Sequence, residues 1–107
     1  MIKPRKVQYA IVYGIDGTTA EHMPADGKRF TTRELQGLVG GYLESLIPAN
    51  KRCRQMYCDE DGISKQLPPN PHTQAVCDMR VYLMNGYGLG WRVLGPIVAV
   101  LTREVAS

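Results

Sequence analysis

Four side chains of the sequence belong to the types that bind metal ions, namely Cys53, Cys58, His72 and Cys77. Their spacings, C-x4-C and H-x4-C, lack the close ligand pairs typical of structural zinc sites. If residues 52–60 form one strand, Cys53 and Cys58 also point to opposite faces of it. Three cysteines cannot all pair within one chain, and an odd number suits a reducing compartment. We therefore expect buried free thiols, with no metal and no other cofactor.

Three adjacent carboxylates, Asp59, Glu60 and Asp61, are the candidates for acid–base chemistry. Hydrolysis by paired carboxylates needs them on two sides of a cleft, whereas these three fall at the predicted tip of a hairpin, where acidic residues favour a turn. Ser45 and Ser64 lack the surroundings of an activated nucleophile. We therefore expect that the protein is not an enzyme.

A glycine-rich stretch with aromatic residues, NGYGLGW, ends at Trp91, the only tryptophan. It does not follow a predicted strand, as a dinucleotide-binding loop would. Exposed aromatic residues on a loop are typical anchors for a protein partner. The candidate partner-binding residues are Arg80, Tyr87, Leu89, Trp91 and Arg92. The alternative, that Trp91 covers the core beneath the loop, stays open.

The formal net charge is +3, a small excess for a dedicated nucleic-acid-binding protein. A solvated basic face is the simplest interpretation of the basic clusters. The second hypothesis is nucleic-acid binding through Lys28, Arg29, Lys51, Arg52 and Arg54. A third is the sequestration of an anionic nucleotide by Arg92 beside Trp91. A homodimer would favour the third, since a domain of 107 residues has limited room for a pocket of its own.

Hydrophobic residues make up 44% of the chain and charged residues 21%, a composition typical of globular proteins. No repeat or low-complexity linker divides the chain, so we predict a single domain over residues 1–107. No apolar run approaches the roughly 20 residues that span a membrane. The basic N-terminus indicates a first strand rather than a signal peptide. We expect a cytoplasmic protein with no membrane association.

In the first half, residues 6–13 alternate in polarity and favour an internal strand. A turn at Asp16-Gly17 leads to a return strand over residues 19–23. The stretch TTRELQGLVGGYLESL then begins with a capping box of Thr31 and Glu34. The pair Gly40-Gly41 is best explained as the end of a helix, which leaves residues 42–47 for a short strand. One continuous helix over residues 32–46 is the alternative.

The second half is predicted to contain two further strands, a helix and a last strand with apolar residues on both faces. Whether residues 79–91 belong to the helix or to a loop stays open, and the tail after Thr102 is expected to fray. The elements in order are a strand over residues 52–60, a brief return strand over residues 63–67, a helix capped by Asn70, and a strand over residues 91–102.

The predicted order is β-β-α-β-β-(β)-α-β, with more strands than helices and hairpins between most neighbours. This pattern indicates a small α+β domain of two layers. We predict a mixed, mostly antiparallel sheet with two helices on one of its faces.

Three motifs, LQGLVGGYLE, DEDG and LPPN, resemble the pattern of an uncharacterised family of small proteins from phages, giant algal viruses and mobile elements. That pattern is LQ-x-LVGGY-[IL]-E, an acidic [DN]-E-x-G turn, LPxN and an apolar strand led by glycine. It spans residues 35–101. The matching positions are Leu35, Gln36, Leu38, Val39, Gly40, Gly41, Tyr42, Glu44, Glu60, Gly62, Leu67, Pro68, Asn70 and Gly95.

The resemblance implies a mobile-element origin, a small α+β domain and a helix–Gly-Gly–strand unit. It implies no activity and no catalytic residue, and this chain departs from the pattern by a longer segment between Asn70 and Gly95. We expect a phage or mobile-element accessory protein that binds a host protein or ribonucleoprotein complex in the host cytoplasm. Inhibition of a defence system, of the anti-CRISPR or anti-restriction type, is the most economical version of this hypothesis.

Overall fold

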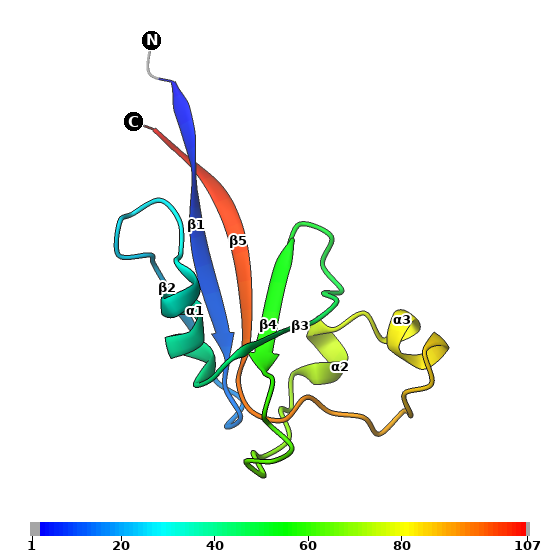
Figure 1. The fold of residues 1–107 in the computed structure, drawn as a ribbon. Coiled ribbons are helices and arrows are strands. Elements are labelled where there is room, and N and C mark those ends of the chain that lie inside the picture. The colour runs from blue at the N-terminus through cyan, green and yellow to red at the C-terminus, as the bar shows by residue number, and fades with distance from the viewer. Residues whose placement is uncertain (1–2, 107) are drawn as a thin grey trace.

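The structure, a computed structural model, describes residues 3–106. Its strands form one five-stranded sheet in the order β2-β1-β5-β4-β3, and every neighbouring pair is antiparallel (Figure 1). The α+β class is confirmed, while the sheet is antiparallel throughout rather than mixed. The elements are β1 Pro4–Tyr13, β2 Thr19–His22, α1 Thr32–Val39, β3 Leu43–Ser45, β4 Gln55–Asp59, α2 Thr73–Val76, α3 Met79–Met84 and β5 Ile97–Ala106.

The central strand β5 is covered on both faces. Ile97 and Ala99 belong to a core cluster with residues of α2 and α3, whereas Val98 and Val100 pack with residues of α1. Because successive residues of a strand point to opposite faces, α1 lies on one face of the sheet and α2 and α3 lie on the other. The prediction of two helices on one face is therefore wrong: the apolar residues of β5 on each face require cover on each side.

Helix α1 begins and ends as its sequence predicts. The Thr31 hydroxyl accepts a hydrogen bond from Glu34 N, and the Glu34 carboxylate accepts one from Thr31 N, which completes the capping box. Gly40 takes the left-handed conformation with φ 91°, so the helix stops there. The strand β3 follows, and the alternative of one continuous helix is excluded.

The segment after β4 forms a series of turns, so the predicted return strand over residues 63–67 is wrong. Lys65 reaches back from these turns and pairs with the buried Asp59, with Nζ 2.7 Å from Oδ2. A side chain at Gly62 would lie 2.9 Å from the Leu94 carbonyl oxygen. The chain therefore folds closely over Asp59 and Leu94 instead of pairing with β4 as a hairpin.

The predicted second helix is divided into α2 and α3, which separate at Cys77 and Asp78. The N-cap of α2 is His72 rather than Asn70, although the Asn70 Oδ1 accepts a hydrogen bond from His72 N at 2.9 Å in the turn that leads into the helix. The Asn70 side chain is fully buried, and its amide also donates to the carbonyls of Tyr13 and Gly95, each at 2.9 Å. Asn70 therefore joins the end of β1 to the segment that leads into β5.

A two-stranded ribbon of β1 and β5 extends beyond the rest of the sheet. The two strands pair from Tyr13 opposite Ile97 to Pro4 opposite Ala106, whereas β4 pairs only with residues 98–100 of β5. The molecule is elongated, with extents of 52 × 27 × 21 Å, and the start of β1 and the end of β5 lie together at the free end of the ribbon (Figure 1). Residues 103–106 of the tail predicted to fray therefore belong to β5, and Ser107 lies outside the described residues. Within residues 3–106, no helix is long and apolar enough to cross a membrane.

Candidate functional site

Three aromatic rings hold the glycine-rich loop against α3. Trp91 stacks on Tyr82 with ring centroids 4.3 Å apart, and Tyr87 meets both rings edge-on, at 5.2 Å from Tyr82 and 4.9 Å from Trp91. The Tyr82 hydroxyl accepts a hydrogen bond from Ile47 N at 3.0 Å, and burial raises the pKa of Tyr82. Trp91 is half-buried and packs against the core. Of the two interpretations of Trp91, the structure favours a ring that covers the core.

Exposed apolar side chains surround this aromatic cluster. Met84 is 86% exposed and Leu89 is 78% exposed, and Leu83 and Tyr87 are exposed beside them in the sequence. We call Leu83, Met84, Tyr87 and Leu89 the α3 patch. Tyr87 and Leu89 are among the partner-binding residues that the sequence predicts, whereas Leu83 and Met84 are not. The exposure of Met84 could have been predicted from the sequence, because Met84 lies outside the apolar helix face that residues 73, 76, 79, 82 and 83 define.

The two arginines of the predicted partner site have internal partners. Arg80 is highly exposed, and its Nε lies 3.7 Å from the Asp78 carboxylate, at the start of its own helix. Arg92 donates through Nη1 to the carbonyl of Trp91 at 2.9 Å and to that of Leu89 at 3.4 Å. Gln74 donates to the same two carbonyls. Arg92 therefore stabilises the base of the α3 patch, whereas an exposed ion pair such as that of Arg80 contributes little to stability.

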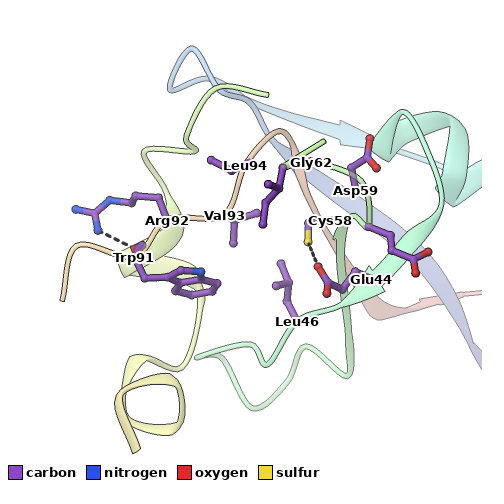
Figure 2. Close-up of a pocket in the computed structure, with 11 residues that line it drawn as sticks. Glu44, Leu46, Cys58, Asp59, Gly62, Trp91, Arg92, Val93 and Leu94 are labelled. Atoms are coloured by element: carbon purple, nitrogen blue, oxygen red, sulfur yellow. Dashed lines mark hydrogen bonds between the residues drawn. The ribbon is translucent and has the colours of Figure 1, made fainter. Parts of the chain in front are cut away.

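A cavity of about 340 Å³ opens beside Trp91. It lies between β3, β4 and the segment that leads into β5, and Figure 2 shows the side chains that line it. Glu44 of β3 accepts a hydrogen bond from the Cys58 thiol, with Sγ 3.5 Å from Oε2. The sequence does not predict this site, because Glu44 and Trp91 are far apart in the chain.

The three thiols are buried and free, as the sequence predicts. Burial raises the pKa of Cys58 and of Cys77 to about 12, and it also raises the pKa of Cys53. Such thiols are protonated at neutral pH and are poor nucleophiles. Cys53 precedes β4 and shares one core cluster with Cys58, so the prediction that they lie on opposite faces of a strand is wrong. No group of three or more metal-ligating side chains occurs in the described part of the chain.

The carboxylates predicted at a hairpin tip have separate environments. Asp59 is buried at the end of β4, and its hydrogen bond from Lys65 is the main reason that the pKa of this carboxyl is lowered. It also accepts a hydrogen bond from Asp61 N at 2.8 Å, while Glu60 and Asp61 are exposed. Asp59 is therefore part of the folded turn.

The two basic segments of the nucleic-acid hypothesis approach the same point of the ribbon. Gln8 N donates to the Lys28 carbonyl at 2.7 Å, and Gln8 also lines a shallow cavity of about 140 Å³ with Arg52 and Arg54. Lys28, Arg29, Lys51, Arg52 and Arg54 are all exposed. The structure therefore places the two segments on either side of Gln8.

We compared the chain with known proteins by sequence family, by sequence and by structure. No family model, no curated protein and no solved structure matches it.

Proposed function

We propose that this chain is a non-enzymatic accessory protein of a phage or mobile element, which acts in the host cytoplasm by occupying a host protein or ribonucleoprotein complex. Its most economical role is the inhibition of a defence system of the anti-CRISPR or anti-restriction type. The resemblance to small phage and mobile-element proteins supports this proposal. The observation that carries it is the α3 patch, whose Met84 and Leu89 side chains are largely exposed.

Exposed apolar side chains on a rigid base are typical of protein–protein contacts. The α3 patch has such a base, because Trp91 stacks on Tyr82 and Arg92 fixes the loop carbonyls. A rigid loop loses little conformational entropy when a partner binds, which favours affinity.

Capture from host lysate tests the proposal, with the bound proteins identified by mass spectrometry. The variant Met84→Ser/Leu89→Ser replaces the two most exposed side chains of the α3 patch, and Ile15→Ser/Met23→Ser replaces two exposed apolar side chains elsewhere. We expect a partner that the wild type and the control retain and the patch variant loses. In cells that carry the targeted defence system, the wild type should restore phage plating and the patch variant should not. Equal capture by all three proteins would contradict the assignment of the surface.

Nucleic-acid binding is the second candidate, and the two basic segments beside Gln8 favour it. Binding through phosphate contacts weakens linearly on a plot of log K against log salt concentration. We expect Arg52→Ala/Arg54→Ala to reduce that slope by about 2, one unit for each lost phosphate contact. The absence of measurable affinity for DNA or RNA at low salt would exclude this candidate.

A further inference from the structure

The cavity beside Trp91 has apolar walls and one ring that is fixed before any ligand arrives. Figure 2 shows the Trp91 ring on one side, with Leu46, Val93 and Cys58 between it and Glu44 on the other side. Stacking on Tyr82 fixes the Trp91 ring. A volume of about 340 Å³ is near the lower limit for ligand pockets, so the cavity suits a group the size of one long side chain.

The charges that face this cavity are negative. The Glu44 carboxylate is oriented by its hydrogen bond from the Cys58 thiol, and Glu60 also lines the cavity. The ion pairs within residues 3–106 are Lys65 with Asp59, Arg80 with Asp78 and Arg103 with Glu21, so Glu44 and Glu60 have no cationic partner there.

The two other charged residues of the lining are already engaged. Asp59 is neutralised by its ion pair with Lys65. Arg92 extends away from the cavity in Figure 2, and its guanidinium donates to loop carbonyls. The cavity beside Trp91 is therefore acidic, which disfavours the anionic nucleotide of the third sequence hypothesis.

We propose that this cavity binds a cationic group on an apolar stem, and that its ligand is a lysine or arginine side chain of the macromolecular partner. The stem would lie along Leu46 and Val93, since long basic side chains cover apolar surface with their methylene groups. The ammonium or guanidinium group would lie between the face of the Trp91 ring and the Glu44 carboxylate. An indole ring is the best aromatic partner for a cation.

This inference rests on the proposed function, and it names the chemistry by which the partner is recognised. The Trp91 ring belongs both to the base of the α3 patch and to the wall of the cavity. A partner that covers the α3 patch can therefore insert a basic side chain into the cavity at the same time. The predicted partner surface is an apolar area with a lysine or arginine at its edge.

Trp91 is the only tryptophan, so its fluorescence reports directly on the cavity. The probes are capped tripeptides with a central lysine, arginine or norleucine between glycines, together with free n-butylammonium. We expect a saturable change in emission with the lysine or arginine tripeptide, and affinity at least fivefold weaker for norleucine, which has the same stem without the charge. Equal binding of norleucine would overturn the cationic assignment. If n-butylammonium bound but neither basic tripeptide did, the assignment of the ligand to a side chain of the partner would be overturned.

The variant Glu44→Gln removes the charge and keeps an oxygen that can accept from the Cys58 thiol. We expect it to weaken binding of the basic tripeptide at least fivefold, while the control Glu104→Gln on the ribbon leaves affinity unchanged. Trp91→Phe keeps an aromatic ring in the cavity wall but removes the fluorescent indole. Binding to this variant is therefore followed by the amide chemical shifts of residues 44–46. We expect the variant to bind the basic tripeptide more weakly than the wild type. Unchanged affinity in Glu44→Gln would overturn the inference.

The two proposals fail in different ways. If the tripeptides do not bind but Met84→Ser/Leu89→Ser still abolishes capture of the partner, the cavity assignment is wrong and the proposed function stands. If the tripeptides bind as expected but the patch variant captures the same partner as the wild type, the α3 patch is wrong and the cationic site stands.

Discussion

Trp91 lies almost parallel to Tyr82, with ring centroids 4.3 Å apart and an angle of 24° between the ring planes. Tyr82 in turn accepts a hydrogen bond from Ile47 N, just after β3. These contacts connect the glycine-rich loop through α3 to the segment beside the sheet. The loop is therefore held by the folded core, although three of its residues, Gly86, Gly88 and Gly90, are glycines. Its exposed residues are presented from a fixed position.

The first prediction concerns the two roles of the loop. Trp91→Ala removes the stacking on Tyr82 and the contacts of this half-buried side chain with the core. We expect it to lower the free energy of unfolding by about 2–3 kcal/mol. Leu89→Ala removes a side chain that is largely exposed, so its effect on stability should stay within about 0.5 kcal/mol. Urea denaturation followed by circular dichroism measures both. Equal stability of the two variants would show that Trp91 does not support the core.

The second prediction separates the glycines of the stretch GLVGG. Gly37 lies within α1, and a side chain there would meet no atom within 4 Å. Gly37→Ala should therefore stabilise the protein by about 1 kcal/mol, because alanine is the better helix former. Gly40 has φ 91°, so Gly40→Ala should destabilise it by about 1 kcal/mol. In thermal unfolding, the melting temperature should rise for Gly37→Ala and fall for Gly40→Ala.

Gly41 has a different constraint from Gly40. A side chain at Gly41 would lie 2.7 Å from Lys65 Nζ and from one Asp59 carboxylate oxygen. Gly41→Ala should therefore destabilise the protein by displacing this ion pair. In the background Asp59→Asn/Lys65→Met, the effect of Gly41→Ala should be smaller. An undiminished effect in that background would point to backbone strain instead.

Local signals in the sequence predicted much of the fold. The capping box at Thr31, the stop at Gly40 and the apolar residues of β5 each depend on nearby chemistry, and each is confirmed. The return strand over residues 63–67 is wrong because a contact with Leu94, distant in sequence, decides the path of the chain at Gly62. The placement of the helices failed for a similar reason, since one-sided cover was assumed for a strand with two apolar faces.

The candidate site was only partly accessible to sequence reasoning. The loop around Trp91 has a local signal, its aromatic residues among glycines. The cavity has no local signal in the sequence, because Glu44 and Trp91 come to line one cavity only through the pairing of β3 with β4 and of β4 with β5. Asn70 was expected to cap a helix, and its two long-range hydrogen bonds depend on where β1 and β5 end.

The third prediction tests Asn70 as the link between β1 and β5. Asn70→Asp keeps the shape of the side chain and replaces the donating amide with an oxygen that faces the carbonyls of Tyr13 and Gly95. We expect a loss of about 3 kcal/mol or more in the free energy of unfolding, because the buried Gly95 carbonyl and the part-buried Tyr13 carbonyl lose their donor and face a carboxylate. Asn85→Asp is the control, since Asn85 is the exposed C-cap of α3 and its side chain donates only to the nearby Val81 carbonyl. Chemical denaturation at pH 7 should separate the two variants clearly.

The fourth prediction concerns pH. The hydrogen bond from Lys65 lowers the pKa of Asp59 below its ordinary value, so the ionised carboxylate stabilises the folded state. This contribution is complete above the unfolded pKa of about 3.9 and disappears as the pH falls through the folded pKa. The stability of the wild type should therefore fall more steeply below about pH 4 than that of Lys65→Met.

The measurement is the urea midpoint between about pH 2 and pH 6, the range over which carboxylates titrate. The two proteins should differ most near the top of this range and converge near its lower end. Arg80→Met is the matched control, because the Arg80 pair with Asp78 is longer, at 3.7 Å, and more exposed. Parallel curves for the wild type and Lys65→Met would mean that the ion pair does not set the acid stability.

The last prediction concerns the thiols. With pKa values raised to about 12 by burial, Cys58 and Cys77 carry about one thiolate in ten thousand at pH 8. Reaction with a thiol reagent in the native protein should therefore be slow and should follow the rate of unfolding, whereas all three cysteines should react at once in urea. Ile63→Cys supplies a positive control, because residue 63 is 84% exposed. If a native cysteine reacted as fast as this added thiol, it would be accessible and ionised, and the interpretation of all three as inert core residues would fail.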